Sequence, residues 1–280
     1  MNPQKISRIS SYAEKPIGIF DSGLGGLTVL RELRKALPNE HFIYLGDTAR
    51  TPYGAKSVST IVRYSVECAS FLSNFDVKLV VVACNTSSAA ALSELDERFP
   101  CPVIGTIGPA VRAAVAASRT KRFGVIGTQG TIASGAYDKA LHLAAPGSFV
   151  SSLACPLFVP LVEQGMLDGE IVDKVIELYL APLKSEGIDT LILGCTHYPL
   201  LTPRIQNFLG SSVKIIECSK AITEDVLETL SRGGAVASGP GQEDYYVTDE
   251  VSRFNHLAKL ILQQDHVHAA HVEELVGAVA

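Results

Sequence analysis

Two stretches, "VVVACNTSSA" (residues 80–89) and "LILGCTHYPL" (residues 191–200), carry the same unusual pattern. In each, a short apolar run ends in a small residue, a cysteine and a polar residue, and Cys195 follows Cys84 by 111 positions. Near-continuous apolar runs of this length are typical of parallel strands that are buried on both faces. The two stretches therefore predict a chain that contains two similar α/β halves.

The repeat extends to neighbouring strands. The runs "PIGIF", "HFIYLGD", "KLVVVAC" and "PVIG" are followed in the same order by "FGVIG", "SFVSSLAC", "TLILGC" and "VKIIEC". Their matched positions are Gly18 with Gly124, Phe42 with Phe149, Cys84 with Cys195, and Ile104 with Ile215, at separations of 106, 107, 111 and 111 residues. Any α/β protein repeats strands loosely, but a cysteine at the same place in both third strands favours two related half-molecules.

The fold class that we predict is α/β, with two similar parallel-sheet domains related by a pseudo-twofold and an active site in the cleft between them. Helical patterns at 57–74 and 168–184 separate strands, as this class requires. A chain of 280 residues is also too long for one ordinary core. We expect a discontinuous first domain of residues 1–107 plus 220–280, with a possible strand at "DYYVTD", and a second domain of residues 108–219.

Composition excludes several classes of protein. The net charge of −5 and the absence of a run of Lys and Arg argue against a nucleic-acid-binding or anionic-membrane-binding surface. No apolar run approaches a membrane span, and "MNPQKISRISSYAEKP" has no apolar stretch for a signal peptide, so we expect a cytoplasmic protein. Six cysteines without a CxxC pair suggest reduced thiols rather than a disulfide framework or a structural zinc site.

Polar residues cluster where the predicted strands end. Ligands bind beyond the carboxyl ends of the strands in open parallel sheets, so two such edges facing each other would form one site. The residues at these ends are Asp21 and Ser22, Asp47, Asn85 and Thr86, and Thr196 and His197, together with the two cysteines. A cysteine just before a helix also experiences the positive helix terminus, which favours the thiolate.

Two thiols on opposite walls of a pocket suit one reaction in particular. A single base cannot reach both faces of a stereocentre, whereas a thiolate and a thiol can remove a proton from one face and return one to the other. The pair Cys84 and Cys195 therefore suggests a racemase or epimerase. The alternative is that both are ordinary buried thiols at the ends of apolar strands.

Five motifs resemble those of glutamate racemase, the cofactor-independent enzyme of the aspartate/glutamate racemase group. They are "IGIFDSGLGGLTVLREL", "YLGDTARTPYGAKS", "VVACNTSSAAAL", "CPLFVPLVEQG" and "LILGCTHYPLL", within a resemblance that runs from about Pro16 to about Val276. The segments "GCTHYP" and "PYG" favour the glutamate branch over the aspartate branch. The resemblance implies two α/β domains with the active site between them, and D-glutamate supply to peptidoglycan in a bacterium.

The same resemblance assigns roles to individual residues. It implies that Cys195 takes the α-proton from L-glutamate and that Cys84 takes it from D-glutamate. Asp21, His197 and Glu163 match groups that assist the thiols. The substrate-binding positions that it implies are Asp21, Ser22, Tyr53, Gly54, Asn85, Thr86, Thr196 and His197. It implies a small-molecule substrate, L- or D-glutamate, and no cofactor, and it allows a homodimer.

Three other features carry less. "DSGLGG" imitates a dinucleotide-binding fingerprint, but Thr28 stands where the third glycine should be, so a nucleotide cofactor is not expected. Cys218 departs from most relatives of this type, and we interpret it as an inert thiol. His266, His268 and His271 form HxHxxH without supporting ligands, so we expect a solvated tail there rather than a metal site. Racemisation of aspartate or another small amino acid by the same thiols, and ligand binding in the cleft without chemistry, are the alternatives to glutamate racemisation.

Overall fold

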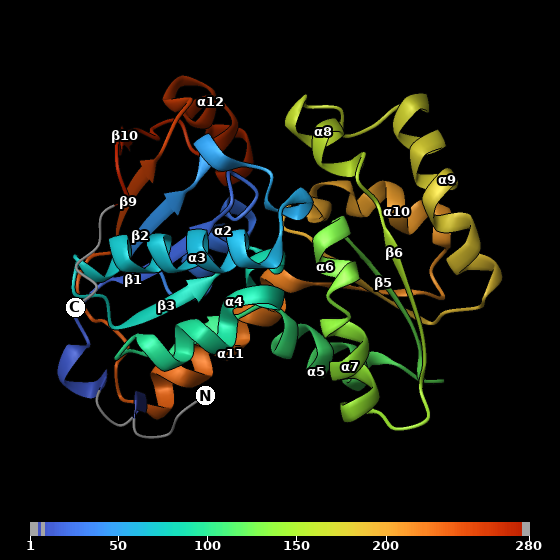
Figure 1. Ribbon diagram of the computed structural model, residues 1–280, viewed down its shortest axis with the longest axis horizontal. Coiled ribbons are helices and arrows are strands. Elements are labelled where there is room, and N and C mark those ends of the chain that lie inside the picture. Colours follow the sequence, from blue (N-terminus) through green and yellow to red (C-terminus); the bar gives the residue numbers. More distant parts are fainter. Residues whose placement is uncertain (1–4, 7–8, 276–280) are drawn as a thin grey trace.

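The computed structural model describes residues 5–6 and 9–275, and it contains two parallel sheets (Figure 1). The six-stranded sheet has the order β10-β9-β2-β1-β3-β4, and the four-stranded sheet has the order β6-β5-β7-β8. All strand pairs are parallel. The predicted fold class, two parallel-sheet α/β domains, is confirmed. We call the part built on the six-stranded sheet the first domain and the other the second domain.

The first domain uses strands from both ends of the chain. Its strands are β1 (Ile17–Asp21), β2 (His41–Gly46), β3 (Leu79–Val82), β4 (Val103–Gly105), β9 (Gln242–Val247) and β10 (Ala269–His271). Strand β9 contains most of "DYYVTD" and pairs with β2, so the C-terminal part returns to the first half as expected. The domain boundaries at 107/108 and 219/220 stay a prediction, and residues 1–4, 7–8 and 276–280 lie outside the description.

The second domain contains β5 (Arg122–Gly127), β6 (Phe149–Ala154), β7 (Thr190–Gly194) and β8 (Lys214–Glu217). The order β6-β5-β7-β8 repeats the order β2-β1-β3-β4 strand for strand. Gly18 pairs with Val80 as Gly124 pairs with Leu191. Cys84 lies four residues after Val80, and Cys195 lies four residues after Leu191. The internal repeat is therefore a repeat of topology and register as well as of sequence.

Two of the matched positions were wrong by one residue. The register Ile17 to Phe42 corresponds to Phe123 to Val150, so Phe42 has Val150 and not Phe149 as its counterpart. By the same reasoning Ile104 corresponds to Ile216. The slips fall in β2 and β6 and in β4 and β8, where connections of unequal length shift the sequence without shifting the ladder.

Helices cover both faces of each sheet. Successive residues of the central strands point to opposite faces and are mostly apolar, so both faces must be buried. In β1, Ile17 and Ile19 pack in one core and Phe20 in another. The helices of the first domain are α2 (Leu27–Ala36), α3 (Val58–Ser73), α4 (Asn85–Arg98), α11 (Cys218–Arg232) and α12 (Val251–Leu262), and those of the second are α5 (Ile107–Ala117), α6 (Gln129–Ala133), α7 (Ala136–Ala144), α8 (Phe158–Glu163), α9 (Glu170–Ser185) and α10 (Thr202–Leu209). The predicted helices at 57–74 and 168–184 are thus confirmed as α3 and α9.

Short 3₁₀ turns complete the chain at η1 (Ile9–Tyr12), η2 (Thr48–Arg50), η3 (Tyr53–Ala55) and η4 (Tyr198–Leu201). Helices α5 and α11 follow β4 and β8, where the chain passes from one sheet to the other, and they pack against each other. No helix in the described part of the chain is long and apolar enough to cross a membrane.

Candidate active site

The candidate residues lie at the carboxyl ends of four central strands. Asp21 is the last residue of β1, Cys84 follows β3 and caps α4, and Cys195 follows β7. Thr128 follows β5 and caps α6. Since β1 and β3 belong to one domain and β5 and β7 to the other, the two cysteines come from different domains.

One small cavity of about 30 Å³ joins these ends. Nine of the eleven candidate residues line it: Ser22, Tyr53, Gly54, Cys84, Asn85, Thr86, Cys195, Thr196 and His197. Glu163 instead lines an adjoining hollow of about 290 Å³, which shares Thr51, Pro52, Gly54, Thr128 and Val159 with the cavity. Asp21 is fully buried behind the lining. The cavity has room for roughly two water molecules, so the two domains are closed over the site.

Cys84 lies in an environment that keeps a thiol protonated. Its sulfur accepts from the backbone N–H of Ser87 at 3.5 Å and lies 3.6 Å from the hydroxyl of Ser22. Burial and the nearby charge of Asp21 raise the pKa of the Cys84 thiol to about 11, although hydrogen bonds to the sulfur act in the opposite direction. Burial also raises the pKa of Asp21, whose oxygens accept from Gly23 and Thr196.

Cys195 has a cation beside it instead. Its sulfur lies 3.8 Å from Nδ1 of His197, and Nε2 of His197 lies 3.2 Å from Oε1 of Glu163. Burial alone would lower the pKa of His197, but its contacts with Cys195 and Glu163 outweigh burial and raise that pKa to about 10. These contacts favour the protonated, imidazolium form of His197, which lies against the sulfur of Cys195.

Glu163 connects this pair to the first domain. Its Oε2 lies 3.4 Å from Nη2 of Arg253 in α12, and Arg253 also binds Glu250 at 2.9 Å. Burial would raise the pKa of Glu163, but the hydrogen bond from His197 and the charge of Arg253 lower it overall. The carboxylate is thus held ionised between a cation from each domain.

Backbone from the two domains approaches closely at the site. The hydroxyl of Thr28 donates to the carbonyl of Thr196 at 2.9 Å. A side chain at Gly25 would meet Thr196 and would place its Cβ 2.5 Å from Nδ1 of His197. Gly54 is similar, because a Cβ there would lie 2.6 Å from the Cβ of Thr128. These glycines of "DSGLGG" and "PYG" permit close contact between the domains.

Neutral hydrogen-bonding groups supply the rest of the lining. The hydroxyls of Thr86, Thr128 and Thr131 form a cluster with separations of 2.9 to 3.1 Å. The side chain of Asn85 is buried, and its Oδ1 accepts from Thr106. The hydroxyl of Tyr53 donates to Asp47, which also binds Arg50, so Asp47 braces the η2–η3 loop. Such groups can hold carboxylates without a large positive charge.

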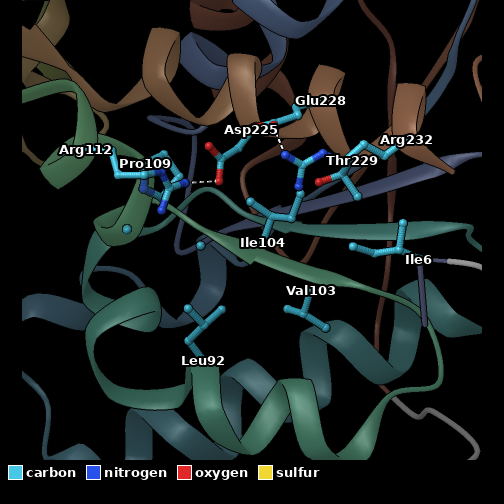
Figure 2. A pocket seen from close by; sticks show the side chains of 12 residues that line it. Ile6, Leu92, Val103, Ile104, Pro109, Arg112, Asp225, Glu228, Thr229 and Arg232 are labelled. Carbon is cyan, nitrogen blue, oxygen red and sulfur yellow. Dashed lines mark hydrogen bonds and ion pairs between the residues drawn. The ribbon is translucent and has the colours of Figure 1, made fainter. Parts of the chain in front are cut away.

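A larger hollow lies elsewhere and lacks these properties. It encloses about 770 Å³ beside β4, α5 and α11 (Figure 2). Its arginines are already paired, Arg112 with Asp225 and Arg232 with Glu228. Cys84, Cys195 and His197 do not line it. The chemistry of the chain is therefore concentrated in the smaller cavity.

Three other sequence expectations can be compared with the structure. Cys218 is buried and donates to the carbonyl of Leu193 at 3.1 Å, and burial raises its pKa to about 12, as expected of an inert thiol. His271 belongs to β10 rather than to a tail. Within residues 5–6 and 9–275, no group of three or more His, Cys, Asp or Glu side chains has the arrangement of a metal site.

Some residues of the site were missed from the sequence. Thr128 could have been found, because it stands 106 positions after Ser22, at the same separation as the matched glycines of β1 and β5. Val159 lines the cavity from α8. Arg253 reaches Glu163 across 90 positions, and no local pattern marks that contact.

A cleft between two parallel α/β domains with one thiol from each domain defines the class of protein, an amino-acid racemase and hence an isomerase. The family model described as "Asp/Glu/Hydantoin racemase" matches residues 17–226, which is most of the chain. Two solved structures below 20% identity, described as an aspartate racemase and a homologue of one, share only the general fold at a TM-score of 0.57.

Closer relatives identify the branch. Glutamate racemase from Aquifex aeolicus is 55% identical over 89% of this chain and 94% of its own length. The structure of a Bacillus anthracis glutamate racemase isoform matches with a TM-score of 0.90 at 41% identity, covering 93% of this chain and 98% of that one. That of the Francisella tularensis enzyme in complex with D-glutamate has a TM-score of 0.87 at 37% identity, with coverage of 93% and 98%. The chain belongs to the glutamate racemases of the Asp/Glu/Hydantoin racemase family.

Proposed function

We propose that the protein interconverts L-glutamate and D-glutamate without a cofactor, by proton transfer between two thiols and the α-carbon. The observation that carries this proposal is that Cys84 and Cys195 come from different domains and line one closed cavity with unequal surroundings. One thiol is held protonated, and the other has an imidazolium beside it. Two-base racemisation requires such a pair at the start of a turnover.

In the direction from L- to D-glutamate, the Cys195 thiolate removes the α-proton and the Cys84 thiol donates a proton to the opposite face. His197, supported by Glu163, stabilises the anionic form of Cys195. Asp21 favours the protonated form of Cys84 through its negative charge. The reverse direction begins with the proton on Cys195 and the charge on Cys84. The two thiols therefore exchange roles while the substrate stays in place.

The remaining lining residues would bind the substrate. Ser22, Asn85, Thr86 and Thr196 offer hydroxyl and amide groups for the two carboxylates and the ammonium. Tyr53 and Gly54 belong to the η3 loop that closes the cavity. The α-proton is weakly acidic, so exclusion of water and fixed dipoles around the developing carbanion must supply much of the rate.

Glutamate does not fit a cavity of about 30 Å³, so entry requires the domains or the loops at the mouth to separate. The hollow of about 290 Å³ beside Glu163 is the entrance that the geometry offers. We further propose that the D-glutamate supplies peptidoglycan synthesis, as the resemblance implies. A cytoplasmic location and a homodimer stay predictions.

The test is racemisation without added cofactor, followed by chiral chromatography, with L-glutamate and L-aspartate as separate substrates. We expect turnover of glutamate, and loss of at least ~10³-fold in Cys84→Ser and in Cys195→Ser, because each removes an acid–base group. Cys101→Ser is the matched control, since Cys101 does not line the cavity. Turnover of aspartate alone would assign the sister activity. Normal turnover in either active-site variant would refute the two-thiol mechanism.

A further inference from the structure

Asn85 has one side-chain group that the protein itself leaves unused. It is the first residue of α4, directly after Cys84, and it lines the cavity with its side chain buried. Its Oδ1 accepts two hydrogen bonds, at 2.6 Å from the hydroxyl of Tyr137 and at 2.9 Å from that of Thr106. Its Nδ2 is also buried, and it has no hydrogen-bond partner in the described part of the chain. A buried amide donor without a partner is unfavourable, and in native structures it commonly points to a function.

The two hydroxyls determine which end of the amide is left over. An Asn side chain can rotate by half a turn and exchange its oxygen for its NH₂ group. In the observed orientation, Tyr137 and Thr106 each donate their one proton to the oxygen. In the opposite orientation the NH₂ group would face both hydroxyls, and each hydroxyl proton would need another acceptor.

Cys218 makes that opposite orientation costly for Tyr137. The sulfur of Cys218 lies 3.1 Å from the hydroxyl of Tyr137, and the thiol donates to the carbonyl of Leu193. The other groups beside the Tyr137 hydroxyl are the sulfur of Cys218, which accepts weakly, and the hydroxyl of Thr106, whose own proton would still need an acceptor. The Tyr137 hydroxyl is therefore best satisfied by donating to Oδ1 of Asn85, which fixes the oxygen of the amide toward Tyr137.

We propose that Tyr137 is a positioning residue for substrate binding: its hydroxyl fixes the amide of Asn85 so that Nδ2 is presented to a carboxylate oxygen of the bound amino acid. The inference rests on the proposed function, in which Asn85 binds substrate. Tyr137 lies in α7 of the second domain and is almost fully buried, whereas Asn85 lies in the first domain. The hydrogen bond therefore joins the two domains. It orients Nδ2 of Asn85 when the domains have the arrangement seen in this structure.

The test is the kinetics of Tyr137→Phe in both directions. The ring stays in place and only the hydroxyl is lost, so we expect KM for L- and for D-glutamate to rise about tenfold with kcat changed less than about threefold, since a uniform binding interaction is weakened. Tyr245→Phe is the matched control, because the Tyr245 hydroxyl is bonded to Glu243 in β9 and does not line the cavity. A normal KM in Tyr137→Phe would overturn the inference.

A double-mutant cycle separates this inference from the proposed function. Asn85→Ala should raise KM by itself, and a normal KM in that variant would refute substrate binding by Asn85. Adding Tyr137→Phe to Asn85→Ala should change KM little further, because Tyr137 acts through Asn85. Independent, multiplying effects of the two substitutions would overturn the positioning role while leaving the racemase proposal intact.

A second variant decides the matter if Tyr137→Phe does not fold. Thr106→Val removes the other hydroxyl that donates to Oδ1, while the backbone N–H of Thr106 keeps its bond to Ser88. We expect the same pattern of raised KM and preserved kcat. An unchanged KM in a folded Thr106→Val variant would contradict the idea that these hydroxyls orient Asn85.

Discussion

At the scale of single residues, the two halves have equivalent cysteines in unequal surroundings. Cys84 caps the fourteen-residue helix α4, whereas Cys195 is followed by the 3₁₀ turn η4. Of the two, only Cys84 thus stands at the start of an α-helix, and burial and Asp21 nevertheless raise its pKa to about 11, so the expected thiolate is not favoured there. Cys195 instead has a charged histidine beside it. In the proposed mechanism, this difference distinguishes the thiol that donates a proton from the thiolate that removes one.

His197 predicts a specific dependence of stability on pH. Its pKa is raised from about 6.5 to about 10 in the folded protein, so the folded state binds the proton more tightly than the unfolded chain does. The resulting stabilisation is fully present below about pH 6.5 and is lost as the pH rises through about 10. We expect the difference in free energy of unfolding between wild type and His197→Gln to shrink between pH 6 and pH 10 in urea titrations.

The exposed His142 provides the control for that series. His142→Gln should change the free energy of unfolding little at any pH, as is usual for surface substitutions. A difference between wild type and His197→Gln that stays constant from pH 6 to pH 10 would contradict the assignment of a charged, paired His197.

At the scale of helices and strands, the sequence predicted what local patterns determine. Apolar runs marked the strands, and the repeated cysteine marked equivalent strand ends, so most of the cavity lining could be named in advance. A strand at "DYYVTD" was expected within the first domain, but its pairing with β2 was not. Tyr137 lies 52 positions from Asn85, and Arg253 lies 90 from Glu163. Such contacts depend on packing between elements, which no single segment encodes.

The strand–helix turn that contains Gly25 gives a prediction at this scale. A methyl group there would collide with Thr196 and His197. Gly25→Ala should therefore push these two residues, which follow β7, away from the first domain. We expect kcat/KM to fall by about 10²-fold, the effect of a displacement near 1 Å in an active site. The melting temperature should change by only a few degrees. Steady-state kinetics and thermal unfolding measure the two quantities.

Gly108→Ala is the matched control for that substitution. Gly108 lies in α5 away from the cavity, and a Cβ there would meet only the mobile end of Arg112 at 3.4 Å. Its activity should equal that of the wild type. A Gly25→Ala variant with full activity would show that close approach of the two domains at this turn is not required.

At the scale of the whole molecule, one ion pair links the two domains beside the candidate site. Arg253 of α12 in the first domain contacts Glu163 of α8 in the second, and Glu163 contacts His197. This ion pair bridges the domains beside the hollow that adjoins the cavity. Helix α12, from the C-terminal part of the chain, thus supplies an ion-pair partner to a candidate site residue.

Arg253→Ala tests this link. The guanidinium is 40% exposed, so the pair contributes little to stability and the melting temperature should stay within a few degrees of wild type. Activity should fall several-fold because Glu163 loses its partner across the cleft, and raised salt should narrow the gap between variant and wild type. Lys259→Ala, also on α12, is the control. Equal activity of Arg253→Ala and wild type at low salt would refute the link.

The central claim is that two thiols act on opposite faces of one carbon, and isotope transfer at early times tests it most directly. L-glutamate is incubated with the enzyme in D₂O, and both enantiomers are separated and analysed by mass spectrometry before much substrate has reacted. We predict that the D-glutamate formed carries one α-deuterium, while the recovered L-glutamate carries almost none. D-glutamate that retains the original α-proton, or L-glutamate that gains deuterium as fast as product forms, would show a single base and contradict the two-thiol mechanism.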